Sequence, residues 1–84
     1  MYSVSLSKQA EKFISRSEKK LAQRLFDTIS RLEQEPVPHD AKTIEGSNRT
    51  FRVRVGKYRI LYTINPSTKE ILVVRIDHRE KVYD

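Results

Sequence analysis

Three arginines alternate with apolar residues within one short stretch, residues 51–62, of this 84-residue chain. The three are Arg52, Arg54 and Arg59. The dipeptide Gly56-Lys57 divides the stretch, and glycine in the first position is typical of a two-residue hairpin loop. A hairpin closed there pairs Arg54 with Arg59 directly. Because side chains alternate between the faces of a strand, it also places all three guanidinium groups on one face.

Like charges that face each other destabilise a sheet, so this arrangement predicts an anionic ligand. Arginine donates paired hydrogen bonds to phosphate oxygens and keeps its charge at any ordinary pH. Three such groups could hold an RNA phosphate and stabilise the added charge of a pentacoordinate transition state. The neighbouring 2′-OH of RNA is a built-in nucleophile, so the reaction would need neither a metal nor a cofactor. The alternative is a solvated strand whose long arginine side chains cover apolar surface.

The charge of the whole chain agrees with an anionic partner. The formal net charge is +6 and the isoelectric point is about 9.8. Positive charge gathers between residues 49 and 59, where Arg49 and Lys57 join the three arginines and no acidic residue occurs. Clustered positive charge is typical of nucleic-acid binding, so Arg49 and Lys57 are predicted to contact RNA phosphates as well.

Several other classes of chemistry are excluded or disfavoured. The chain contains no cysteine, which excludes disulfides, thiolate metal sites and cysteine nucleophiles. Two distant histidines, His39 and His78, are too few for a metal site. No apolar run has the length of a membrane span, and the first residues do not resemble a secretion signal. We therefore expect a single cytoplasmic domain spanning residues 1–84, with no metal and no membrane contact.

The N-terminal third predicts a strand followed by two helices. Tyr2, Val4 and Leu6 alternate with serines, as in a half-buried strand. Ser7 is then expected to cap a short helix that ends near residue 16, and Ser17 to cap a longer one. An apolar stripe at helical spacing along the second helix predicts a core-facing side. The stripe comprises Leu21, Ala22, Leu25, Phe26, Ile29 and Leu32.

The remainder of the chain predicts three strands. Pro36 and Pro38 end the second helix, and an irregular segment leads to the arginine hairpin. A further strand, residues 70–76, has apolar residues at both odd and even positions, which predicts burial on both faces. The expected fold is α+β, with the order β-α-α-β-β-β. It has an antiparallel sheet, the helical hairpin packed on one face and the arginines on the other.

Three segments in this order resemble the RelE/ParE toxin superfamily. They read AKTIEG at 41–46, FRVRVGKYRILY at 51–62 and VRIDHREKVY at 74–83. The resemblance implies a RelE-like fold and a toxin of a type II toxin–antitoxin system. It further implies a ribosome-dependent endoribonuclease that cuts mRNA in the A site, next to 16S rRNA. A cognate RelB-like antitoxin is implied as its inhibitor.

The resemblance also assigns roles by position. Arg52 and Arg54 match the two basic residues of the first hairpin strand, and Arg59 matches the arginine of the second. Arg79 matches the C-terminal arginine, and Tyr83 matches the tyrosine that serves as general base. In this scheme Tyr83 deprotonates the 2′-OH while Arg59 and Arg79 hold the phosphate.

One departure concerns the proton donor. The hairpin cations are often lysines in this family, and one of them acts as general acid. Arg54 is a poor donor because arginine keeps its proton at any ordinary pH. His78 is therefore a candidate donor, because the ordinary pKa of histidine is about 6.5. Two alternative functions stay open: a ParE-like inhibitor of DNA gyrase and a non-catalytic RNA-binding module.

Overall fold

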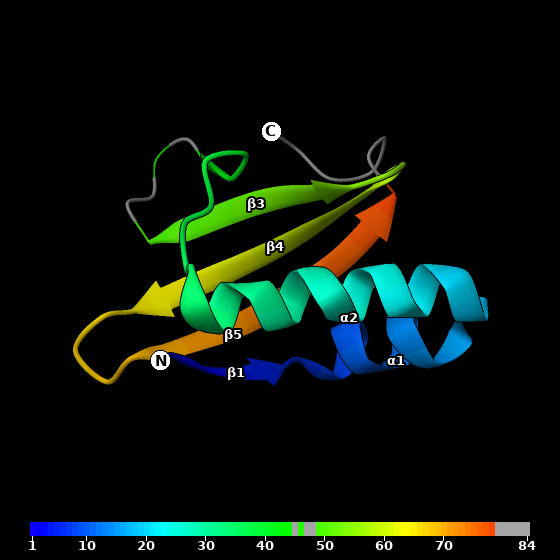
Figure 1. Cartoon of the computed structure of the whole chain (residues 1–84), viewed down its shortest axis with the longest axis horizontal. Helices are drawn as coiled ribbons and strands as arrows, with labels where there is room; N and C mark the ends of the chain where they lie inside the picture. Colours follow the sequence, from blue (N-terminus) through cyan, green and yellow to red (C-terminus); the bar gives the residue numbers. More distant parts are fainter. Residues whose placement is uncertain (45, 47–48, 79–84) are drawn as a thin grey trace.

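Two consecutive helices lie against one face of a five-stranded sheet in the computed structural model, which describes residues 1–44, 46 and 49–78 (Figure 1). In chain order the elements are β1 (Ser3–Leu6), α1 (Lys8–Arg16), α2 (Lys19–Gln34), β2 (Lys42–Thr43), β3 (Thr50–Val55), β4 (Tyr58–Asn65) and β5 (Glu70–His78). The predicted α+β fold is confirmed. No helix among the described residues is both long and apolar enough to cross a membrane.

The strand order across the sheet is β1-β5-β4-β3-β2. Strands β3, β4 and β5 form the predicted antiparallel meander. The sheet as a whole is mixed, because β1 pairs with β5 in parallel and the two-residue β2 adds an edge beside β3. The parallel pairing joins Ser3 to Glu70, residues so far apart in the chain that no local sequence pattern reports it.

The β3–β4 hairpin has the predicted register. Val55 pairs with Tyr58, and Arg54 pairs with Arg59. Gly56 adopts a φ of +58°, a left-handed conformation that glycine tolerates better than other residues. A Cβ atom at this position would also lie 3.1 Å from the guanidinium nitrogens of Arg24 on α2. The turn therefore needs glycine both for its backbone conformation and for this close approach.

A β-bulge in β5 explains why its apolar residues occupy both odd and even positions. Tyr62 pairs with Val73, whereas its neighbour Leu61 pairs with Arg75. Val74 is thus an additional residue on β5, and such a residue shifts the alternation of side chains by one position.

The shift corrects the prediction that this strand is buried on both faces, which was wrong. Ile71 and Val73 face the core before the bulge, and Ile76 faces the core after it. Leu72 and Val74, by contrast, are 42% and 39% exposed. The strand therefore has one buried face, which changes parity at the bulge.

Ser7 caps α1, as predicted. Its hydroxyl oxygen accepts a hydrogen bond from the backbone N–H of Ala10 at 3.1 Å and donates one to the carbonyl of Val74 at 2.6 Å. The Gln9 amide then pairs with both backbone groups of Ile76, at 2.7 and 2.9 Å. The first turn of α1 thus forms hydrogen bonds with the edge of β5 beyond the point where β1 ends.

We predict that Ser7→Ala lowers the free energy of unfolding by about 1–2 kcal/mol, because it removes both an N-cap and a contact with β5. Urea denaturation followed by circular dichroism measures this change. Ser15→Ala is a matched control, since the Ser15 hydroxyl only donates to the Lys12 carbonyl in the same helix. A loss at Ser15 as large as that at Ser7 would contradict the capping role.

Ser17 does not cap α2, so that prediction was wrong. Its backbone N–H donates to the Ile14 carbonyl and its hydroxyl donates to the Phe13 carbonyl at 2.7 Å, which closes the end of α1. The N-cap residue of α2 is Glu18, whose side chain makes no capping hydrogen bond. The hydroxyl of a junction serine can serve either helix, and here the carbonyls that end α1 bind it.

The apolar stripe of α2 packs onto the sheet as predicted. Leu25, Ile29 and Leu32 are buried, and Leu21 packs against them at the edge. Phe26 lies at the margin of the stripe and is 60% exposed. The main core consists of Ala10, Leu25, Ile29, Leu32, Val53, Val55, Ile60, Tyr62, Ile64, Ile71, Val73 and Ile76.

The hydroxyl of Tyr62 is a structural group within this core. It donates a hydrogen bond to the Pro36 carbonyl at 2.8 Å, and the ring stacks on Phe51 at 5.7 Å. Burial, with a smaller contribution from the negative charge of Asp40, raises the pKa of Tyr62 from 10.0 to about 12. This tyrosine is therefore protonated at neutral pH and is not suited to act as a base.

The raised pKa predicts a pH dependence of stability. The folded state holds the Tyr62 proton more tightly than the unfolded state, so the contribution is complete below pH 10 and is lost as the pH rises towards 12. A shift of this size corresponds to roughly 3 kcal/mol. We expect the unfolding free energy of the wild type to fall more steeply over this interval than that of Tyr62→Phe. Parallel curves from urea denaturation would contradict this assignment.

Candidate nucleic-acid interface

The three predicted arginines lie on the sheet face opposite the helices, which we call the arginine face. Val53, Val55 and Ile60 are buried towards the helices, so the alternating residues of β3 and β4 point to the other side. Arg54 is exposed and Arg52 is partly exposed, whereas Arg59 is only 4% exposed. Arg54 is thus the member of the facing pair that solvent reaches.

Asp77 on β5 lies in line with the facing arginines across the sheet. Asp77 is the partner of Arg59 on the side away from Arg54. Its Oδ2 atom accepts hydrogen bonds from Arg75 at 2.9 and 3.2 Å, and its Oδ1 atom accepts one from the backbone N–H of His78 at 2.8 Å. The local sequence around the arginines contains no acid, so only the sheet pairing places this carboxylate beside Arg59.

A small cavity at the outer edge of the arginine face gathers further positive charge. It measures about 230 Å³ and is lined by Asp40, Lys42, Arg52 and Arg54. Lys42 pairs with Arg52 across β2 and β3. Asp40 lies 3.3 Å from the guanidinium of Arg31, which partly neutralises the one acid here. Three cations around a small cavity suit the tetrahedral, multiply charged oxygens of a phosphate.

Sequence reasoning missed Lys42, Arg75 and Asp77 as members of this surface. Lys42 belongs to a two-residue strand, which is too short to show any periodicity. The faces of Arg75 and Asp77 depend on the bulge. The sequence could have indicated them in one way: all three lie in segments 41–46 and 74–83, which flank the hairpin and resemble the toxin family.

The other two predicted phosphate ligands lie at opposite ends of the hairpin. Lys57 is exposed in the turn, next to the Arg54–Arg59 pair. Arg49 is exposed at the far end, where its carbonyl accepts a hydrogen bond from Ile64. Arg49 lies five positions before Arg54, or about 16 Å at the rise of an extended strand. Arg49 is therefore not part of the same cluster and extends the basic surface along the sheet.

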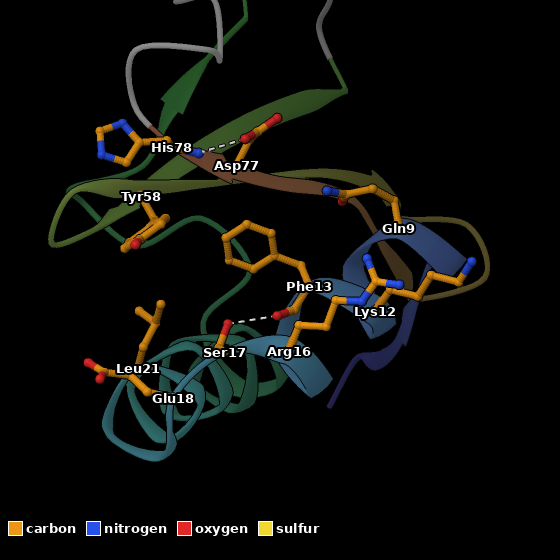
Figure 2. A pocket seen from close by; sticks show the side chains of 10 residues that line it. All are labelled: Gln9, Lys12, Phe13, Arg16, Ser17, Glu18, Leu21, Tyr58, Asp77 and His78. Carbon is orange, nitrogen blue, oxygen red and sulfur yellow. Dashed lines mark hydrogen bonds between the residues drawn. The ribbon is translucent and has the colours of Figure 1, made fainter.

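His78 lies on the helix side of the sheet, not on the arginine face. Its ring meets the ring of Tyr58 edge to face at 5.4 Å, and Tyr58 in turn meets Phe13 of α1 at 5.6 Å (Figure 2). The structure therefore does not bring His78 together with Arg54 and Arg59. Arg79 and Tyr83 lie outside the described residues, and their roles stay predictions.

Comparisons with known proteins agree on one group of relatives. The family model described as the ParE toxin of the type II toxin–antitoxin system parDE matches residues 2–83. Toxin RelE3 of Methanocaldococcus jannaschii is 42% identical over 45 residues, which cover 54% of this chain and 49% of that toxin.

Two solved structures extend the likeness to nearly the whole chain. The archaeal RelE–RelB complex from Pyrococcus horikoshii contains a chain that is 30% identical, with a TM-score of 0.85 over 96% of this chain and 98% of that one. The RelBE2 toxin–antitoxin complex from Mycobacterium tuberculosis contains one that is 25% identical, with a TM-score of 0.79 over 93% and 98%. Fold and sequence thus point to the same relatives.

Proposed function

Because this chain belongs to the RelE/ParE family, as a RelE-like toxin of a type II toxin–antitoxin system, we propose that it is a ribosome-dependent endoribonuclease. Its substrate would be mRNA in the A site of the ribosome, and its effect would be to stop translation. The observation that carries the proposal is the facing pair Arg54 and Arg59, with Arg52 and Lys42 beside it on the sheet face opposite the helices. This arrangement supplies the charge that phosphoryl transfer requires.

In the proposed reaction the 2′ oxygen of one nucleotide attacks the adjacent phosphorus. Tyr83 takes the 2′ proton, a 2′,3′-cyclic phosphate forms, and the bond from phosphorus to the 5′ oxygen breaks. Arg54 and Arg52, which solvent reaches, hold the phosphate together with Arg79, while the nearly buried Arg59 adds positive charge beside Arg54 and helps to stabilise the negative charge that develops on the oxygens. Nearby cations favour the ionised form of a tyrosine and lower its pKa, which Tyr83 needs in order to act as a base.

The leaving 5′ oxygen must gain a proton. Arginine releases a proton too weakly to supply it, and His78 packs against Tyr58 on the other side of the sheet. We therefore assign this proton to water. A site with strong charge stabilisation and no dedicated acid would cleave slowly by itself, which is consistent with dependence on the ribosome to orient the RNA.

The proposed protein partner is a RelB-like antitoxin. Both solved relatives described above are toxin–antitoxin complexes, and each contains its antitoxin. A net charge of +6 also favours an acidic partner. Such a toxin would act in the cytoplasm, where it meets translating ribosomes.

Mapping RNA ends after expression without an antitoxin tests the proposed function. We expect new ends inside translated messages, and we expect them to disappear when initiation of translation is blocked. Cuts that persist without translation would contradict dependence on the ribosome. Unchanged growth and intact RNA at high expression would favour a non-catalytic binding module.

A second candidate is inhibition of DNA gyrase, because the family model that matches the chain is that of the ParE toxin. The same experiment separates the two functions. A DNA-damage response with intact mRNA would favour the gyrase inhibitor, whereas cleaved mRNA without such a response would favour the endoribonuclease.

A further inference from the structure

A cavity of about 630 Å³ opens at the end of the sheet that carries the Arg54–Arg59 pair, but on the helix side (Figure 2). We propose that this cavity binds one nucleotide of single-stranded RNA beside the cleavage site. The base would contact an aromatic cluster, and its phosphate would contact two cations of α1. This inference rests on the proposed function, because it assumes that RNA is the ligand of the arginine face.

The aromatic cluster consists of Phe13, Tyr58 and His78. The three rings meet edge to face, at 5.6 and 5.4 Å between centroids, and all three line the cavity. None of them is buried, so each keeps part of its surface available to a ligand. Unpaired bases stack on aromatic side chains of this kind, at about 1–3 kcal/mol per base, and proteins bind single-stranded RNA in this way.

Lys12 and Arg16 line the α1 side of the cavity, one helical turn apart. Both are exposed, and neither forms an ion pair with any residue that the structure describes. Cations arranged beside partly exposed aromatic rings favour a ligand that is both flat and anionic, which describes a nucleotide.

Two acidic residues also line the cavity, and neither is directed at the aromatic cluster. The carboxylate of Asp77 accepts hydrogen bonds from Arg75 and from the backbone of His78, and it points away from Phe13 (Figure 2). Glu18 points outward at the opposite rim, beyond Leu21 (Figure 2). Negative charge therefore does not oppose a phosphate at the α1 side.

The position of the cavity connects it to the arginine face. Tyr58 directly precedes Arg59 in β4, so the aromatic cluster and the facing arginines are neighbours on opposite faces of one sheet end. The exposed Lys57 occupies the turn between them, and Arg24 of α2 reaches the same turn. An RNA strand that passes around this turn therefore meets positive charge at the turn itself.

Binding of an RNA that cannot be cleaved tests the inference. The probe is a pentanucleotide with 2′-O-methyl groups on every ribose, and its comparison series carries one abasic residue at each position in turn. We expect one abasic position to weaken binding to the wild type by about tenfold in fluorescence anisotropy. In NMR spectra, the ring signals of Phe13 and Tyr58 should shift with the intact probe and remain in place with that abasic one.

A pair of charge-matched variants tests the phosphate contact. Lys12→Gln with Arg16→Gln should weaken binding of the intact probe by about tenfold. Lys8→Gln with Lys69→Gln removes the same charge at exposed positions that do not line the cavity, and it should weaken binding by less than about threefold.

Equal losses in the two double variants, or equal affinity for every abasic probe, would overturn the inference. The proposed function is judged separately, because mRNA cleavage by the wild type does not enter either comparison. A toxin that cleaves ribosome-bound mRNA but binds all probes equally would retain its function and refute the nucleotide cavity.

Discussion

Replacing Arg54 by alanine should reduce cleavage of ribosome-bound mRNA by about 10²–10³-fold, the usual cost of removing one donor that stabilises transition-state charge. Arg54 is the exposed member of the facing arginine pair, and it also lines the small basic cavity with Lys42 and Arg52. The variant should fold normally, because an exposed side chain contributes little to the core. Removing one of two facing like charges also relieves a repulsion with Arg59.

Single-turnover cleavage of a programmed ribosome measures this effect, and circular dichroism monitors the fold. Lys69→Ala is the control, since it removes one positive charge from the opposite end of the sheet, in the β4–β5 turn. We expect the control to cleave within about threefold of the wild type. If Arg54→Ala also stays within threefold while folded, Arg54 does not act on the transition state.

Replacing Asp77 by alanine should lower the free energy of unfolding by about 3 kcal/mol, the cost of removing the partner of a buried charge. Arg59 is only 4% exposed, and the strand register places Asp77 beside it on β5. Without this carboxylate, the guanidinium group of Arg59 lies between Arg54 and a neutral residue. The side chain of Asp77 is itself 15% exposed, so little solvent is available to screen the lost interaction.

Urea denaturation of a second variant, Arg75→Ala, shows whether the lost stability comes instead from the exposed ion pair of Arg75 with Asp77. Arg75→Ala removes the ion pair between Arg75 and Asp77, but the side chain of Arg75 is 52% exposed, so the loss should stay below about 1 kcal/mol. A loss at Arg75 equal to that at Asp77 would assign the stability to the surface pair. A loss below 1 kcal/mol in both variants would show that Asp77 does not balance the charge of Arg59.

The local parts of this fold were predictable because they depend on near neighbours. The hairpin register follows from Gly56-Lys57 and from strict alternation on both sides, and it is confirmed residue by residue. The stripe of α2 follows from its spacing, and the cap at Ser7 follows from its position directly before α1. The family resemblance, drawn from three short segments, is confirmed by the match over residues 2–83.

The parts that were not predictable depend on distant pairing. The bulge at Val74 decides which residues of β5 face the arginines, and it arises only when β5 pairs with β4. Burial of Arg59 was also unexpected, since alternation assigns a face and not a degree of exposure. His78 lies on the helix side because it pairs with Tyr58, although its position in the sequence suggested a place near the phosphate.

The most direct test of the proposed function is whether the 2′-OH of the RNA is the nucleophile. A purified ribosome would be programmed with two messages that differ only in one 2′-OH, at the nucleotide before the cleaved bond. We predict that the wild-type toxin cuts the ribose message, leaving a 2′,3′-cyclic phosphate, and leaves the 2′-deoxy message intact at that position. Equal cleavage of both messages, or cleavage of neither, would contradict the proposed function.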